Sequence, residues 1–125
     1  MRRVFKSRNF ARWAAKAHLA DAALCAAVEE MSNGLIDADL GGGVVKKRVA
    51  MPGRGKRGGA RTLLATNKAS RWFFVFGFEK NERGSIDTRE LEALQMLAKN
   101  YLSLTSVQLT EAVVNNVVEE ICHVH

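Results

Sequence analysis

The stretch RWFFVFGFEK occupies residues 71–80. Between residues 72 and 78, apolar side chains fill the positions on both alternating sides of an extended chain. This pattern is typical of a strand at the centre of a sheet that is covered on both faces. We therefore predict that this stretch is the central strand of the fold. Burial in a core also accounts for its aromatic rings better than stacking on nucleobases does.

Two more runs of strand character precede the central strand, at residues 44–50 and 61–66. A loop rich in glycine separates them at 52–59, and a turn at 67–70 leads into the central strand. Short connections favour neighbouring antiparallel strands. The three strands are therefore predicted to form an antiparallel meander.

Helical patterns lie on both sides of the meander. Apolar residues at helical spacing predict a helix over residues 8–18, after a short strand at 4–6. Asp21 is expected to cap a second helix that ends near Asn33. Further along, D-x-x-E and T-x-x-Q capping boxes are predicted to open two more helices, of which the last spans residues 106–121.

The order of these elements predicts an α+β fold in a single domain over residues 1–125, the size of one ordinary domain. A curled antiparallel sheet would pack against the N-terminal helix pair and the C-terminal helices. Residues 106–125 would form a C-terminal helical extension. No apolar run is long enough to span a membrane, and residues 1–10 do not resemble a secretory signal, so we expect no membrane association.

Basic residues are concentrated in the middle of the chain. The formal net charge is +6, and residues 40–78 contain nine of the 19 Lys and Arg residues but no Asp or Glu. Generic protein surfaces mix the two signs, so this segment indicates a site for a polyanion. A basic surface that increases solubility and binds nothing is the alternative.

The loop between the first two strands of the meander contains a match to a nucleotide-binding pattern. Gly53, Gly55 and Gly58 spell G-x-G-x-x-G. A dinucleotide fingerprint needs a helix that begins inside it and an acidic residue about 20 positions on. Here a predicted strand follows, and the next acidic residue is Glu79. We interpret the match as a coincidence in a glycine-rich loop.

The same loop and its flanking strands indicate a phosphate site instead. Strand alternation places Lys46 and Arg48 on one face and Lys47 on the other. If the face of Arg61 on the next strand coincides with that of Lys46, the three side chains converge below the loop. Arg54, Lys56 and Arg57 in the loop would then hold flanking phosphates by charge and by bidentate guanidinium contacts.

Other reactive side chains carry less information. Cys25 and Cys122 lie far apart in the sequence, and we expect two free thiols in a reducing cytoplasm. Cys122, His123 and His125 could ligate a metal, but a frayed terminus is the preferred interpretation, and no metal or cofactor is expected. Tyr101 fits the apolar face of a helix. The sequence contains no recognisable nucleophilic triad or carboxylate pair.

The segments GLIDADLGGGVVKKRVAMPGRGKRGGARTLLA (34–65), RWFFVFGFEKNE (71–82) and LEALQMLAKNYL (91–102) resemble the HigB-like branch of the RelE/ParE toxins of bacterial type II toxin–antitoxin modules. The resemblance covers residues 4–104. It implies a microbial-ribonuclease-like fold and an mRNA endonuclease that acts on the ribosome in the cytoplasm without a metal. It also implies an antitoxin partner, expected to be a helix-turn-helix protein.

The resemblance also implies roles for individual residues. Family positions that contribute to catalysis correspond to Lys46, Arg48, Arg61 and Lys80. Asn81 replaces an arginine of RelE and is expected to contact RNA. The remaining predicted RNA-binding residues are Lys47, Arg54, Lys56 and Arg57.

Three questions stay open in the sequence. RelE has a catalytic tyrosine that is missing near residues 86–92, so the groups that move protons are not identified. A ParE-like toxin that poisons gyrase without cutting RNA is the alternative function, and an inactive nucleic-acid-binding module is a third. Val114 and Val118 on the last predicted helix are expected to offer apolar surface to the antitoxin.

Overall fold

The computed structural model describes residues 2–53 and 59–123. It contains six strands and four helices among these residues. In chain order they are β1 (Arg3–Ser7), α1 (Arg8–Lys16), α2 (Asp21–Ser32), β2 (Ala38–Gly41), β3 (Val44–Val49), β4 (Ala60–Thr66), β5 (Arg71–Glu79), α3 (Thr88–Leu102), α4 (Ser106–Val114) and β6 (Val118–Ile121). The α+β class predicted from the sequence is confirmed.

The strands form one curled sheet in the order β2-β3-β4-β5-β1-β6. The pairs β3–β4 and β4–β5 are antiparallel, so the predicted meander is confirmed. The pair β1–β5 is parallel, whereas an antiparallel sheet was predicted throughout. The parallel pairing arises because two helices separate β1 from the meander and return the chain to the far edge of the sheet.

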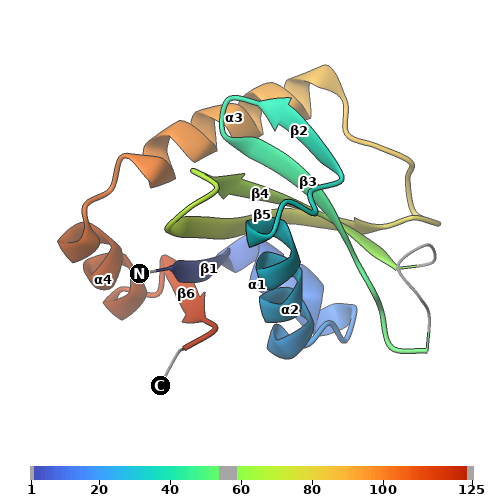
Figure 1. Cartoon of the computed structure of the whole chain (residues 1–125), viewed down its shortest axis with the longest axis horizontal. Coiled ribbons are helices and arrows are strands. Elements are labelled where there is room, and N and C mark those ends of the chain that lie inside the picture. Colours follow the sequence, from blue (N-terminus) through green and yellow to red (C-terminus); the bar gives the residue numbers. More distant parts are fainter. Residues whose placement is uncertain (1, 54–58, 124–125) are drawn as a thin grey trace.

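Each face of the sheet is covered by its own helices (Figure 1). On one face, α1 and α2 pack on side chains that include Leu64, Trp72 and Phe74. On the other face, α3 and α4 pack on side chains that include Phe5 and Phe73. Strand β5 contributes buried residues to both cores, as its apolar pattern predicts.

Capping boxes fix the starts of the two C-terminal helices. Asp87 accepts a hydrogen bond from the Glu90 backbone, and Thr105 does the same for Gln108. The reciprocal side-chain bonds are also present, so both predicted boxes are confirmed. The predicted cap at Asp21 is wrong, because helix α2 begins at Asp21 after the extended residue Ala20, and the Asp21 carboxylate pairs with Lys6 instead.

The helix predicted over residues 106–121 is also wrong. Helix α4 ends at Val114, Asn116 adopts a left-handed conformation with φ of 57°, and residues 118–121 form strand β6. Strand β6 pairs with β1, so this segment belongs to the sheet and is not an appended helix. The short edge strand β2 was not predicted either. It pairs with β3 through a tight turn, with Gly41 and Gly42 at positive φ.

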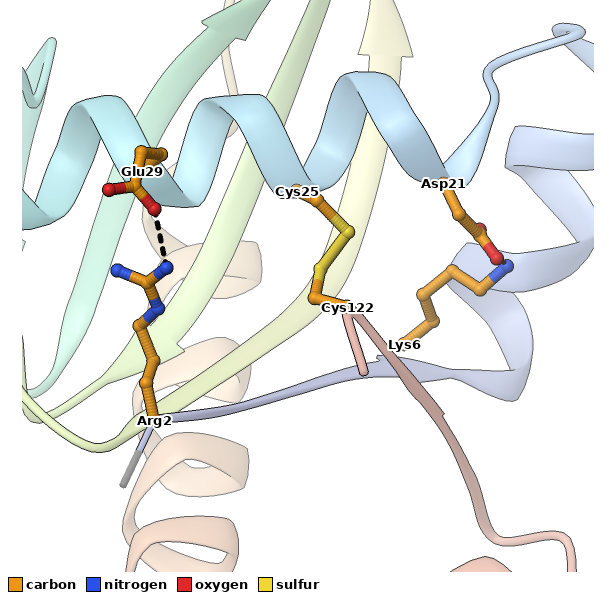
Figure 2. Close-up of a disulfide and its surroundings, with 6 residues drawn as sticks. All are labelled: Arg2, Lys6, Asp21, Cys25, Glu29 and Cys122. Atoms are coloured by element: carbon orange, nitrogen blue, oxygen red, sulfur yellow. Dashed lines mark hydrogen bonds and ion pairs between the residues drawn. A yellow bond between two sulfur atoms is a disulfide. The ribbon is translucent and has the colours of Figure 1, made fainter. Parts of the chain in front are cut away.

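The two cysteines form a disulfide that joins α2 to the residue after β6 (Figure 2). The expectation of free thiols is therefore wrong, because the fold brings together Cys25 and Cys122 across a sequence separation of 97 residues. Ion pairs link β1 or the residue before it to α2 on either side of the disulfide: Arg2 with Glu29 and Lys6 with Asp21. The N-terminal strand, α2 and the C-terminal strand are thus fastened together.

Candidate nucleic-acid interface

The β3–β4 pair brings three predicted site residues onto one face of the sheet. Arg48 pairs with Arg61 in the register, and Lys46 pairs with Leu63. Directly paired residues of antiparallel strands project on the same side. The predicted coincidence of the two strand faces is therefore confirmed. We call the group Lys46, Arg48 and Arg61 the cation face.

The members of the cation face differ in their contacts. Lys46 and Arg61 are half-buried, and Arg48 is exposed. Arg48 is held by Asp37: its backbone N–H donates to Oδ2 over 2.7 Å and its Nε donates to Oδ1 over 3.0 Å. Burial of the Asp37 carboxyl opposes its ionisation, but the hydrogen bonds and charge of Arg48 outweigh this and hold the pKa of Asp37 below its ordinary value.

Lys47 lies on the opposite face, as alternation predicts, and it is not available to RNA. Only 4% of its side chain is exposed. Its ammonium group donates to the backbone carbonyl of Leu35 over 2.8 Å and pairs with Glu30 over 3.0 Å. A buried ammonium held this way anchors the loop after α2 to the sheet. The prediction that Lys47 binds RNA is therefore corrected.

Lys80 and Asn81 are exposed in the turn that follows β5. Ala60 pairs with Glu79, so this turn lies beside the start of β4 and at the same end of the sheet as Arg61. The predicted contributors Arg54, Lys56 and Arg57 lie outside the described residues. The fold thus gathers strand cations and the Lys80 turn at the end of the sheet where residues 53 and 59 also lie.

A family model described as "RelE toxin of RelE / RelB toxin-antitoxin system" matches residues 2–121. The match covers nearly the whole chain, including β6. The chain belongs to the RelE toxin family. Family membership implies an antitoxin partner. No curated protein matches the chain.

The fold places a further cation of this RelE-family chain near the cation face. The Arg83 guanidinium lies 5.8 Å and 5.5 Å from the ring centres of Phe76 and Phe78. Phe78 pairs with Arg61 in the β4–β5 register, so Arg83 lies above the same face. Sequence reasoning missed Arg83 because it considered only the position directly after Lys80. Phe76 and Phe78 come after a bulge in β5, and the sequence pattern predicts only a core role for them.

Glu90 restrains Arg83 in this position. The two side chains form an ion pair, and hydrogen bonds from Arg83 and from the Asp87 backbone hold the pKa of Glu90 below its ordinary value. Asp37 thus pairs with Arg48 of the cation face, and Glu90 pairs with the neighbouring Arg83. Neither carboxylate belongs to the acid-free segment at residues 40–78.

Tyr101 is a structural residue in this RelE-family fold. Its ring stacks on Phe73 with the ring centres 4.8 Å apart. Burial raises the pKa of its phenol, so the hydroxyl stays protonated at neutral pH. This agrees with the predicted place of Tyr101 on the apolar side of a helix.

The C-terminal residues offer no thiolate for a metal, because Cys122 is bonded to Cys25. Among residues 2–53 and 59–123, no group of three His, Cys, Asp or Glu side chains is arranged to hold a metal ion. Over the same ranges, no helix is both long and apolar enough to cross a membrane.

Proposed function

We propose that this chain is an mRNA endonuclease, the toxin of a type II toxin–antitoxin module in the HigB-like branch of its family. The observation that carries the proposal is the shared face of Lys46, Arg48 and Arg61 on the paired strands β3 and β4. RNA binding depends on cations that meet successive phosphates, and a sheet face holds such cations at fixed spacing. The proposed site of action is the ribosome in the cytoplasm, with a helix-turn-helix antitoxin as partner.

The proposed reaction is attack of the RNA 2′-hydroxyl on the adjacent phosphate. The new bond joins the 2′-oxygen to phosphorus, and the bond from phosphorus to the 5′-oxygen breaks. The reaction requires removal of the 2′ proton, neutralisation of the phosphorane and protonation of the leaving oxygen. We assign neutralisation to Arg61, because a planar guanidinium matches two phosphate oxygens and keeps its charge. Lys46, Arg48 and Lys80 remain the candidates for proton exchange.

Arg83 is the proposed second guanidinium of the site. In RelE an arginine follows the lysine that corresponds to Lys80, and this chain has Asn81 there. Arg83 supplies a guanidinium near the same face, two residues further along. Support comes from its contact with Phe76 and Phe78 and from the register that pairs Phe78 with Arg61. Phosphate binding would compete with Glu90 for this side chain.

Primer extension on mRNA during translation tests the proposal. Wild-type protein should produce discrete cuts, and Arg61→Ala should reduce the cleavage rate by about 10²–10³-fold, the typical loss for one donor to a developing anion. Lys99→Ala is the matched control, since Lys99 is an exposed cation in the last turn of α3. Its cleavage rate should equal that of wild type.

The same assay separates the alternatives. Intact mRNA with DNA-damage signalling in cells would support a ParE-like gyrase poison and contradict the proposal. Intact mRNA without such signalling, together with RNA binding in a filter assay, would support an inactive binding module. Equal cleavage by wild type and Arg61→Ala would remove Arg61 from the mechanism.

A further inference from the structure

The loop between α2 and β2 is bonded to three consecutive residues of strand β3. The Asp37 backbone N–H donates to the carbonyl of Lys46 over 3.1 Å. The buried Lys47 ammonium donates to the carbonyl of Leu35 over 2.8 Å. The Arg48 backbone N–H donates to Asp37 Oδ2 over 2.7 Å. Three hydrogen bonds to one strand leave this loop little freedom, so the Asp37 carboxylate has a fixed place beside the cation face.

The same carboxylate holds the Arg48 side chain. Its Oδ1 accepts a hydrogen bond from Arg48 Nε over 3.0 Å, while its Oδ2 accepts from the Arg48 backbone. One carboxylate thus joins the main chain and the guanidinium of a single residue, which restricts the rotamers of that side chain. The Asp37 side chain is 21% exposed, so water screens the contact only in part.

This contact leaves the outer end of the Arg48 guanidinium available. Asp37 takes Nε, and in the described parts of the chain the two terminal nitrogens have no hydrogen-bond partner. Two terminal nitrogens of a guanidinium match two oxygens of a phosphate. Arg61 lies directly opposite Arg48 in the strand register, and like charges in such a pair repel. Asp37 therefore also offsets the repulsion that would otherwise drive Arg48 away from Arg61.

We propose that Asp37 is a positioning residue, which holds the Arg48 guanidinium beside Arg61 with its terminal nitrogens directed at the phosphate chain of the RNA. The inference rests on the proposed endonuclease function and deepens it. It assigns Arg48 to phosphate contact, because a guanidinium keeps its proton in proteins. Lys46 and Lys80 are then the cations left for proton exchange.

The sign of the effect separates positioning from charge alone. Asp37 places a negative charge beside a site that binds a polyanion. If charge were its only contribution, its removal would strengthen RNA binding and would not slow cleavage. If Asp37 positions Arg48, its removal slows the bond-breaking step even though the site becomes more cationic, because a misplaced donor no longer meets the developing charge.

Single-turnover cleavage on ribosomes programmed with a defined mRNA measures both quantities: the maximal rate and the toxin concentration that gives half of it. Asp37→Ala should lower the maximal rate by about 10–100-fold, since a displacement of about 1 Å can cost about 10²-fold. The half-saturating concentration should stay equal or fall. Asp37→Asn retains one acceptor oxygen, so its rate should lie between those of Asp37→Ala and wild type.

Asp39→Ala is the matched control for loss of a carboxylate. Asp39 lies on β2, is exposed and pairs with Lys68 instead of a member of the cation face. Its cleavage rate should equal that of wild type. An equal loss of rate in Asp37→Ala and Asp39→Ala would show a general effect of charge or stability at this edge and overturn the inference.

A double variant tests whether Asp37 acts through Arg48. Asp37→Ala with Arg48→Ala should cleave as fast as Arg48→Ala alone, because the carboxylate then has no side chain to hold. Multiplied losses would mean that Asp37 acts independently and would overturn the inference. If Asp37→Ala does not fold, the same comparison is made with Asp37→Asn.

The assay also distinguishes this inference from the function on which it rests. Cleavage by wild type together with an undiminished maximal rate in both Asp37 variants would overturn the positioning role and leave the endonuclease proposal standing. A wild type that cuts no mRNA would reject the endonuclease proposal, and the positioning role with it.

Discussion

Lys46 and Lys47 are adjacent in the sequence, but the two faces of the sheet use them differently. Lys46 lies with Arg48 and Arg61 on the cation face and is half-buried. Lys47 is buried on the side covered by α1 and α2, where Leu35 and Glu30 hold its ammonium group. Lys6 repeats the second pattern, since it is buried and pairs with Asp21 and Glu119.

The difference between the two lysines shows that neighbouring basic residues in one strand can differ in role. One is a buried structural cation, and the other is an accessible cation that can meet phosphate. Strand alternation sends neighbouring cations to opposite faces. On the face that α1 and α2 cover, a cation is buried and needs carboxylate or carbonyl partners to remain charged. On the other face the C-terminal helices leave the end of β3 and β4 accessible, and the cations there can meet a phosphate chain.

Replacing each lysine by alanine is the strongest test of whether Lys46 acts in cleavage and Lys47 in stability. Lys46→Ala should lower mRNA cleavage by about 10²-fold with an unchanged melting temperature, because a half-buried cation contributes mainly to the site. Lys47→Ala should lower the free energy of unfolding by about 1–3 kcal/mol, because the Leu35 carbonyl loses its buried donor. Cleavage per folded Lys47→Ala molecule should match wild type. If Lys46→Ala instead lowered stability and Lys47→Ala instead lowered cleavage per folded molecule, the proposed roles of the two lysines would be refuted.

Removal of the disulfide should produce the next largest effect. Cys25→Ser with Cys122→Ser should lower the free energy of unfolding by about 2–4 kcal/mol, because the cross-link closes a loop of 97 residues and restricts the unfolded chain. Denaturant unfolding with and without a thiol reductant measures the loss. The reductant should destabilise wild type and leave the double variant unchanged. Equal stability of oxidised and reduced wild type would show that the disulfide between α2 and the residue after β6 does not stabilise the fold.

A methyl group at Gly77 tests how tightly α1 packs on that same face of the sheet. A Cβ at Gly77 would lie 2.4 Å from the Trp13 ring, so Gly77→Ala should force Trp13 to move and cost about 1–3 kcal/mol. Gly84→Ala is the matched control, since a Cβ there has no neighbour within 4 Å. Thermal unfolding monitored by tryptophan fluorescence distinguishes them. A stable Gly77→Ala variant would mean that α1 is not tightly packed on β5.

The smallest effect concerns the carboxylate beside the cation face. The pKa of Asp37 is held below its ordinary value, so its pairing with Arg48 contributes stability above a pH of about 4 that is lost as the pH falls through the lowered pKa. Acid unfolding should therefore be less steep in Asp37→Asn. The difference in stability at neutral pH should be about 1 kcal/mol. Identical pH profiles would show that the Asp37–Arg48 pair contributes no net stability.

Local signals in the sequence predicted much of the fold. The continuous apolar run on both sides of the strand identified β5 as the central strand, and the capping boxes at Asp87 and Thr105 fixed the starts of α3 and α4. The same period of two placed Lys46 and Arg48 on one face. The prediction of one helix over residues 106–121 was wrong because the apolar spacing of this segment fits a helix throughout. Asn115 and Asn116, which lie within it, end the helix.

The sequence by itself determined which residues form the meander and which cations project together from a strand, because these properties depend on neighbours along the chain. Only the tertiary structure decided that Cys25 meets Cys122, that Glu30 neutralises Lys47, and that Arg83 reaches the cation face. These contacts join residues that are distant in sequence or lie beyond a turn. Their geometry is fixed by how helices close over the two sides of the sheet, which no local period encodes.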